Sequence, residues 1–349
     1  MTTTLHGPQD PATSTPPRRP RSLRRTTSID MTFPDGLAGD VLLSGTGRDL
    51  CTGADGTARP LDEASFEATI DFAHGQRVTA MTTSPPLDGI EALLGRNAGG
   101  GYRKYLNQVA EDGGLVGSLL FQLLDDLSGA SLVSGYAPQL VAAHGGGGPG
   151  VVEIAQSAEA KEIMLGMGDL CAGWRIGGTM LRSVEEIGRP PMLQGPVAPV
   201  LDDGGDTLAW HDVPAAMTPN GMRRIRRIDV VPGHDDADPL VVDAMFRDTH
   251  MGGDGVITIV HEYELTAEVD PEAFTIRSID ATPRVLPYRE CPDAAASAQR
   301  VVGVTTTGLR ARTRAELVGA STCTHLNDVL RALEDVEPLA AAIADGVSR

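Results

Sequence analysis

Two kinds of hydrophobic pattern run along this chain. In residues 257–265 (ITIVHEYEL) polarity alternates with period two, which is typical of a β-strand with one apolar face, and that face carries His261 and Tyr263. Residues 274–279 (FTIRSI) predict the next strand. Near the end, apolar residues return at helical spacing over 326–336, so the sequence predicts a helix there with Thr322 or Thr324 as its N-cap.

The same series of sequence blocks occurs twice. Residues 24–49 and 223–248 share Arg-Arg, Ile-Asp and Arg-Asp pairs at one constant offset, and residues 115–130 and 317–332 share a block that opens with Leu-Val-Gly and ends with Ala. Because the blocks keep their order, we interpret the chain as an internal duplication. The predicted fold class is α+β: an internal pseudo-dimer of two repeats, each an antiparallel sheet plus a helix, with an inserted cap segment of helices and loops.

The duplication divides the chain into segments, and residues 132–220 have no counterpart after the second repeat. This inserted segment contains a glycine-rich loop (144–150), a predicted helix over 151–174 and both tryptophans, so it is either a cap over a pocket or a connector across both repeats. We expect a disordered tail (1–22), a degenerate α+β repeat (23–131), the connector or cap (132–220), a site-bearing α+β repeat (221–335) and the end of a C-terminal helix with its tail (336–349).

Composition narrows the classes of function. The formal net charge is −18 and aromatic residues make up 4% of the chain, which disfavours a nucleic-acid partner because such proteins need a basic face. No apolar run reaches the roughly 18 to 20 residues that span a bilayer, and the N-terminus has no signal-like apolar core. We therefore expect no membrane partner, a cytoplasmic location with reduced thiols, and a neutral, fairly apolar small molecule as substrate.

Two cysteines and two histidines of the second repeat are the candidate chemical groups: His261, Cys291, Cys323 and His325. At the corresponding positions of the first repeat, the block offsets place apolar residues: Ala64, Leu94, Phe121 and Leu123. A scaffold that needed these side chains for stability should need them in both copies. We therefore interpret the first copy as scaffold and the second as the site.

The motifs around these residues resemble a known family. Pro287-x-x-x-Cys291, the run Cys323-Thr324-His325-Leu326, an upstream Arg-Asp-Thr from Arg247 and His261 together resemble a bacterial family of domains of unknown function marked by a closing Cys-Thr-His-Leu. The resemblance runs from Arg223 to near Leu333, and Thr322 stands where the family usually has Gly. It implies a domain and no particular reaction.

Three interpretations of this constellation remain open. Cys323 at a helix N-terminus beside His325 would favour a thiolate, and His261 with Asp248 would form a second proton-transfer pair. Alternatively, the two cysteines and two histidines bind zinc as a Cys2His2 set, although they lack paired ligand spacing. In the third interpretation these side chains are ordinary buried core residues.

The leading hypothesis is a cofactor-independent lyase (a hydratase or dehydratase) or an isomerase, acting by acid–base chemistry on a neutral apolar molecule such as an alkenol. By class of chemistry alone, it is similar to bacterial alkenol dehydratases. The alternatives are a zinc-stabilised binding module without turnover and a thiol hydrolase that uses Cys323 and His325. The expected catalytic residues are His261, Cys323, His325, Asp248 and Cys291, and the expected pocket residues are Tyr263, Cys171 and Trp174.

Overall fold

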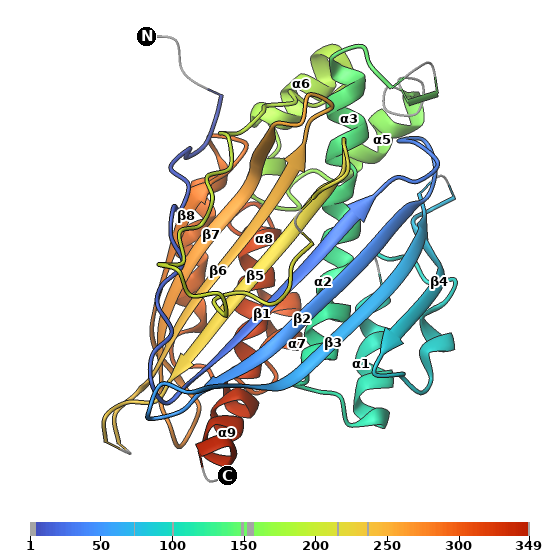
Figure 1. The fold of residues 1–349 in the computed structure, drawn as a ribbon. Coiled ribbons are helices and arrows are strands. Elements are labelled where there is room, and N and C mark those ends of the chain that lie inside the picture. The colour runs from blue at the N-terminus through green and yellow to red at the C-terminus, as the bar shows by residue number, and fades with distance from the viewer. Residues whose placement is uncertain are drawn as a thin grey trace.

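A single antiparallel sheet is the frame of the molecule (Figure 1). The computed structural model describes residues 5–72, 74–99, 101–147, 150–151, 157–214, 216–235 and 237–347. Within these ranges eight strands pair in the order β4-β3-β2-β1-β5-β6-β7-β8, each antiparallel to its neighbours. They are β1 (Ser22–Thr32), β2 (Val41–Thr52), β3 (Ala58–Asp71), β4 (Arg77–Ser84), β5 (Met222–Val231), β6 (Leu240–Met251), β7 (Ile257–Val269) and β8 (Ile276–Val285). The predicted α+β class is confirmed.

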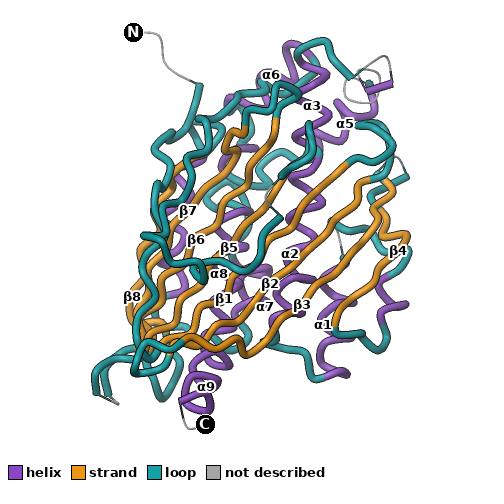
Figure 2. Tube along the Cα trace, in the orientation of Figure 1, coloured by secondary structure: helices purple, strands orange, loops and turns teal. Residues whose placement is uncertain are grey.

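Helices cover one face of this sheet (Figures 1 and 2). Helix α2 (Leu119–Ser134) packs on β1, β2 and β3, whereas α8 (Thr324–Ala332) packs on β6 and β7. Around them lie η1 (Ile90–Leu93), α1 (Tyr102–Gly113), η3 (Cys291–Val301), α7 (Leu309–Glu316), η4 (Leu333–Asp335) and α9 (Val336–Val347). The C-terminal helix predicted from periodicity is thus α8 with its continuation, although its N-cap is Cys323 rather than either threonine. No helix in the described ranges is long and apolar enough to cross a membrane.

The helix face of the sheet holds two apolar cores with a charged seam between them. One core is formed mainly by β1–β4, α1 and α2, and the other mainly by β5–β8, η3 and α7–α9. At the seam, where β1 pairs with β5, the side chains of Arg25, Arg224 and Arg226 are at most 2% exposed. They pair with carboxylates on neighbouring strands and helices. Arg226 donates hydrogen bonds to Asp126 of α2 at 2.7 and 2.9 Å, whereas Arg224 and Arg25 pair with Asp328 of α8 and Asp335 of η4. The seam therefore replaces apolar packing by paired charge.

The opposite face of the sheet is covered by two extended segments, residues 5–21 and 193–214. The main chains of Thr13 and Thr15 hydrogen-bond with that of Asp202, and Arg18 forms an ion pair with Asp206 at 2.7 Å. The prediction of a disordered tail over 1–22 is therefore wrong for residues 5–21, while residues 1–4 lie outside the described ranges. The polar composition of this segment suggested disorder. The segment is nevertheless ordered, because the outer face of the central strands is also polar and supplies hydrogen-bond partners.

The inserted segment caps one end of the sheet before it crosses the outer face. Helix α3 (Tyr136–Ala143) continues from α2, and α5 (Ala158–Gly166), η2 (Ala172–Trp174) and α6 (Thr179–Ile187) follow at the same end (Figure 1). The predicted helix over 151–174 is wrong in length, since α5 ends at Gly166 and glycine weakens a helix. Residues 148–149 of the glycine-rich loop and 152–156 of that predicted helix lie outside the described ranges.

The buried Arg226–Asp126 pair yields a stability prediction. Asp126→Asn should lower the free energy of unfolding by about 3 to 5 kcal/mol, because it leaves a buried guanidinium without a counter-charge. The double variant Arg226→Met/Asp126→Asn should recover most of that loss. Urea unfolding measures both. As a control, Arg312→Met removes the exposed Arg312–Glu316 pair and should change stability by less than about 0.5 kcal/mol. A loss in Asp126→Asn no larger than in this control would contradict the prediction.

Candidate functional site

Three polar side chains from three elements converge on the helix face of the second half: Asp248 of β6, His261 of β7 and His325 in the first turn of α8. Asp248 and His261 are cross-strand partners, and the register shifts directly after them, between Asp248 and Thr249. Such a β-bulge bends the strand and re-aims the side chains beside it. It thereby helps to direct His261 toward the helix that carries His325.

The Asp248 carboxylate is the fixed point of this cluster. It is fully buried and accepts two hydrogen bonds from Arg224, at 2.9 Å from Nε and 3.1 Å from Nη2. Its Oδ2 atom lies 3.4 Å from His261 Nδ1 and 3.9 Å from His325 Nε2. The two imidazoles stack with their centroids 3.5 Å apart and their planes 21° apart. A carboxylate held by arginine thus faces two imidazoles in mutual contact.

The electrostatics of the cluster favour an ionised Asp248 and a neutral His325. Burial opposes ionisation of Asp248, but the charge of Arg224, the neighbouring His261 and the hydrogen bonds from Arg224 hold the pKa of this carboxyl well below its usual range. Burial, and next the neighbouring His261, lower the pKa of His325 well below its ordinary value, against the opposing effect of Asp248. The side chains of His261 and His325 are 12% and 15% exposed, so both imidazoles reach the border of the core.

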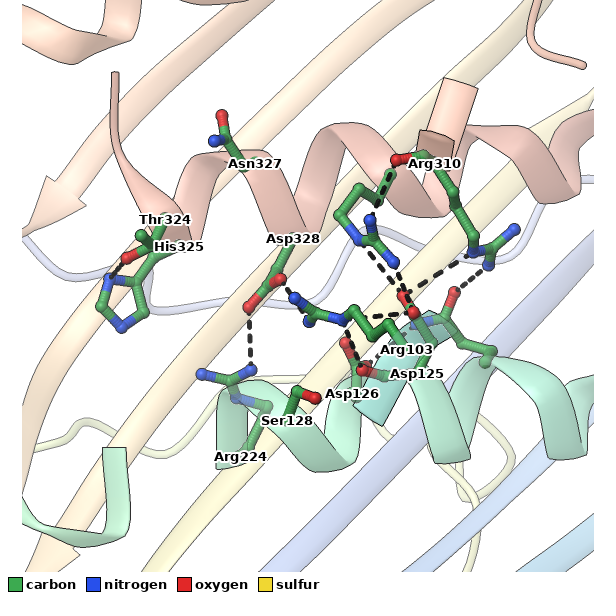
Figure 3. Close-up of polar contacts among 12 residues, drawn as sticks. Arg103, Asp125, Asp126, Ser128, Arg224, Arg310, Thr324, His325, Asn327 and Asp328 are labelled. Atoms are coloured by element: carbon green, nitrogen blue, oxygen red, sulfur yellow. Dashed lines mark hydrogen bonds and ion pairs between the residues drawn. The ribbon is translucent and has the colours of Figure 1, made fainter. Parts of the chain in front are cut away.

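The cluster is the end point of the buried ion pairs of the seam. From Asp248 the contacts pass through Arg224 to Asp328 at 3.2 Å, then to Arg103 at 2.9 Å and to Asp125 at 3.3 Å. Figure 3 shows the part from Arg224 to Asp125. Further members on α7, α8, β1 and η4 are Arg310, Arg331, Arg25 and Asp335. Because arginines and aspartates alternate along these contacts, the charge of Asp248 is balanced without any contribution from the histidines.

The comparison with known families identifies a domain in this chain but no activity. Residues 222–338 match the family model described as a protein of unknown function, DUF2889. These residues form a DUF2889 domain. The match confirms the resemblance to a domain of unknown function, whereas nothing supports the likeness to alkenol dehydratases. No curated protein and no solved structure matches the chain. Arg224, Asp248, His261 and His325 all belong to the DUF2889 domain, so every contact of the cluster described above is internal to it.

Cys323 lies beside the cluster, but as a buried thiol. Its Sγ atom is 4.0 Å from His325 Nδ1, and its side chain is 4% exposed. Burial raises the pKa of Cys323 to about 12, and the hydrogen bonds that it accepts at the start of α8 only partly oppose this. The expectation that the helix N-terminus and an imidazolium would favour the thiolate is therefore wrong, because desolvation outweighs the helix dipole and His325 is neutral.

The remaining predicted residues gather behind Cys323, under the cap. The main chain of Ala172 donates a hydrogen bond to Thr322 at 2.8 Å, which brings η2 against the start of α8. Cys171 and Cys291 both lie next to Gly173, and Tyr263 is fully buried nearby, where burial and then the neighbouring Cys323 raise its pKa. Trp174 packs instead against the apolar cluster of α5 and α6. Of the expected pocket residues, Tyr263 and Cys171 thus lie near Cys291 and Cys323, whereas Trp174 does not.

The predicted Cys2His2 zinc set is not brought together. Among the described residues, one group of His, Cys, Asp and Glu has its ligand atoms within 4.8 Å of one another, and it consists of Asp248, His261 and His325. Cys291 and Cys323 belong to the apolar core of the DUF2889 domain, where burial also raises the pKa of Cys291 well above its ordinary value. The Cys2His2 interpretation is wrong because the two cysteines point into this core.

Strand register also changes one comparison between the halves. The bulge after Asp248 recurs after Asp49, and Asp49 pairs with Asp62 as Asp248 pairs with His261. By strand pairing, the position that matches His261 is therefore Asp62, and not Ala64 as the sequence offset predicted. The first half keeps a charged residue there, so the argument from loss of polarity does not hold for His261.

His250 was missed, although strand periodicity places it on the same face as Asp248, two residues away. Its side chain is 1% exposed, neither ring nitrogen has a hydrogen-bond partner, and burial lowers its pKa to about 4. Its ring meets that of Tyr136, the first residue of α3, edge-on at 5.6 Å. The surface hollow between η1 and α1, by contrast, is lined by none of these residues.

The buried neutral histidines predict that acid destabilises the fold. Burial lowers the pKa of His211 and of His250 to about 4, and that of His325 well below 6.5. An unfolded histidine titrates near 6.5, so below that pH the unfolded state binds protons that the native state does not. The stability is fully present above pH 6.5 and falls with decreasing pH, by up to about 1.4 kcal/mol per pH unit for each such histidine.

Urea unfolding at pH 7.5, 6.5 and 5.0 measures this slope. His211→Asn should reduce it by about one histidine's share, whereas the same change at exposed His234 should leave it unaltered. A wild-type stability that stays constant between pH 6.5 and 5.0 would contradict the neutral state of these residues.

Proposed function

We propose that this chain is a cofactor-independent lyase of the hydratase or dehydratase type, or an isomerase, and that Asp248, His261 and His325 are its proton-transfer centre. The observation that carries this proposal is the pair of stacked imidazoles within 3.4 and 3.9 Å of one buried carboxylate oxygen. Removal of water from an alcohol needs an acid for the leaving hydroxyl and a base for a neighbouring C–H proton. Two imidazoles at this spacing can divide those roles.

The stacking disfavours simultaneous protonation of the two rings. Two imidazolium ions 3.5 Å apart would repel each other strongly, so protonation of one ring disfavours protonation of the other. The ionised Asp248 stabilises the protonated ring. That ring donates its proton to the hydroxyl as the C–O bond breaks, and the neutral ring accepts the C–H proton, so water leaves and a double bond forms. The pair then holds the same number of protons as before.

The buried thiols have a different role in this proposal. Because Cys323 keeps its proton up to a pKa of about 12, it is a poor nucleophile at neutral pH, and a thiol hydrolase is disfavoured. We assign Cys323 and Cys291, with Cys171 and Tyr263, to a buried apolar wall behind the two imidazoles. Four free buried cysteines also support a reducing, cytoplasmic location. An apolar wall with few charges suits a neutral substrate such as an alkenol.

We also propose that the two halves are copies of one ancestral unit. Arg24 pairs with Asp229 across the β1–β5 seam, and Arg223 pairs reciprocally with Asp30. This exchange is the signature of a twofold interface. The bidentate pairs Arg25–Asp49 and Arg224–Asp248 and the bulges beside them support the same relation. Relatives with one copy should then dimerise through the strand equivalent to β5, and a crystal structure with any other interface would count against the proposal.

Substitutions at the centre test the proposed chemistry. His261→Ala and His325→Ala should each lower kcat/KM by about 10²- to 10⁴-fold, the usual contribution of a general acid or base. Cys323→Ser should retain activity within about tenfold of the wild type, since the thiol transfers no proton in this mechanism. The measurement is loss of water from a panel of branched and allylic alcohols, followed by gas chromatography.

The structure offers a matched control for Asp248. Asp248→Asn and Asp49→Asn each break an equivalent buried pair with arginine, but only Asp248 adjoins the two histidines. Both variants should lose similar stability, and only Asp248→Asn should lose turnover in the fraction that remains folded. Full turnover in His325→Ala, or none by the wild type on any alcohol of the panel, would end the proposal.

A metal-dependent function is the second candidate, and the spacing of the ligand atoms favours it. Asp248, His261 and His325 offer oxygen and nitrogen ligands within 4.8 Å of one another. Their contacts of 3.4 and 3.9 Å are close to the roughly 3.3 Å between ligands of a tetrahedral zinc ion with bonds of about 2.0 to 2.1 Å. Arg224 would orient the carboxylate ligand from outside. Zinc held here could stabilise a binding module or activate water.

Metal analysis of protein purified without chelators separates the two candidates. The metal candidate predicts about one zinc or similar transition-metal ion per chain, lost in His261→Ala and His325→Ala and kept in Cys291→Ser and Cys323→Ser. Absence of metal after incubation with zinc supports the cofactor-independent centre. Retention of metal in both histidine variants would place the ion elsewhere and contradict the triad as its site.

A further inference from the structure

A group of buried polar atoms without hydrogen-bond partners lies next to the Asp248 centre. Both ring nitrogens of His250 and the hydroxyl of Thr258 have no hydrogen-bond partner. His250 and Thr258 are cross-strand partners in β6 and β7, so their side chains leave the sheet on the same face. They are 1% and 3% exposed. The three orphan atoms therefore lie on one face of two neighbouring strands, beside Tyr136 at the start of α3.

These orphan atoms are costly to the fold on its own. Each buried donor or acceptor left unpaired costs about 1 to 3 kcal/mol, and more than nine in ten such groups in native proteins are paired. A valine at position 258 would fill nearly the same volume without that cost. In strand register, the equivalent positions of the first half hold Cys51 and Arg59, so the scaffold does not require an imidazole facing a hydroxyl.

The neighbours of His250 do not supply the missing hydrogen bonds. The Tyr136 ring meets it edge-on, with planes 73° apart, and the Tyr136 hydroxyl donates its hydrogen to the main-chain oxygen of Leu193 at 3.2 Å. A neutral imidazole offers one donor and one acceptor, and the Thr258 hydroxyl offers both. One alcohol group between them would receive a donor and an acceptor together. Neither residue carries a charge, so the pair itself offers hydrogen bonds and no counter-charge to a ligand.

We propose that His250 and Thr258 form a hydroxyl-binding subsite, which holds a polar group of a neutral alcohol beside Asp248, His261 and His325. His250 follows Asp248 by two residues on one strand, which places their Cα atoms about 6.6 Å apart. A hydroxyl held at His250 thus leaves the adjoining carbons of the same small molecule within reach of the imidazole pair. The choice of an alcohol rests on the proposed function, whereas the existence of the subsite rests on the orphan atoms alone.

Binding to this subsite can be measured without turnover. In full-length protein labelled with ¹⁵N-histidine, the His250 ring signals are those absent from His250→Phe. A branched allylic alcohol should shift them saturably, and the hydrocarbon in which a methyl replaces the hydroxyl should not. Thr258→Val should weaken alcohol binding about fivefold, equivalent to one hydrogen bond, while the melting temperature of the ligand-free protein stays equal or rises. Thr266→Val, at an exposed position of the same strand, is the control and should change neither quantity.

The outcomes separate this subsite from the proposed reaction. Saturable His250 shifts without any turnover would support the subsite and leave the lyase or isomerase proposal wrong. If Thr258→Val turns over the alcohol with an unchanged KM, the proposed reaction is supported and the subsite is contradicted. The subsite is overturned if the alcohol leaves the His250 signals unmoved up to its solubility limit, or if the hydrocarbon shifts them equally. A lower melting temperature in Thr258→Val, with unchanged binding, would show that the hydroxyl serves the fold instead.

Discussion

The buried pairing of arginine with aspartate at the β1–β5 seam is the interaction on which the rest of this structure depends. Arg25, Arg224 and Arg226 point from the centre of the sheet toward α2 and α8, where apolar side chains would normally pack. A buried guanidinium without a counter-charge would be strongly destabilising, so each one fixes the position of a carboxylate on a helix. Because such pairs need good geometry, they set how α2 and α8 lie on the sheet. The apolar cores on either side then fill the space that these pairs define.

The same requirement prepares the candidate site. Asp248 belongs to this set of pairs through Arg224, which keeps its charge in a fully buried position. Once that charge is balanced within the seam, the histidines around it need not be protonated to keep the fold neutral. The burial that makes the cysteines poor nucleophiles leaves His325 neutral and able to accept a proton. Histidine can still transfer protons here, because its ordinary pKa is close to neutral. A thiol has a higher ordinary pKa, and burial raises it further.

Local patterns in the sequence predicted part of this arrangement. The period-two alternation around His261 identified β7 and the face on which His261 lies, and the spacing from Leu326 to Val336 identified α8 and its continuation. The repeated Arg-Asp blocks pointed to Asp248, but periodicity could not show that Arg224 pairs with it, because that contact joins two strands by register. The extended course of residues 5–21 was missed because amino-acid composition indicates only whether a segment can form an apolar core. This segment is held by main-chain hydrogen bonds, which composition does not reveal.

The Cys2His2 set is not brought together for a related reason. Residue type grouped Cys291, Cys323, His261 and His325, yet they come from a 3-10 helix, an N-cap, a strand and a helix that aim side chains in different directions. The cap separates the cysteines from the histidines, because η2 packs Cys171 and Gly173 against Cys291 and Cys323 and removes these two thiols from solvent. The imidazoles lie closer to the border of the core, in contact with a carboxylate. Chemistry in this domain should therefore follow the residues that keep some access to solvent and have a charged neighbour, and those are His261 and His325.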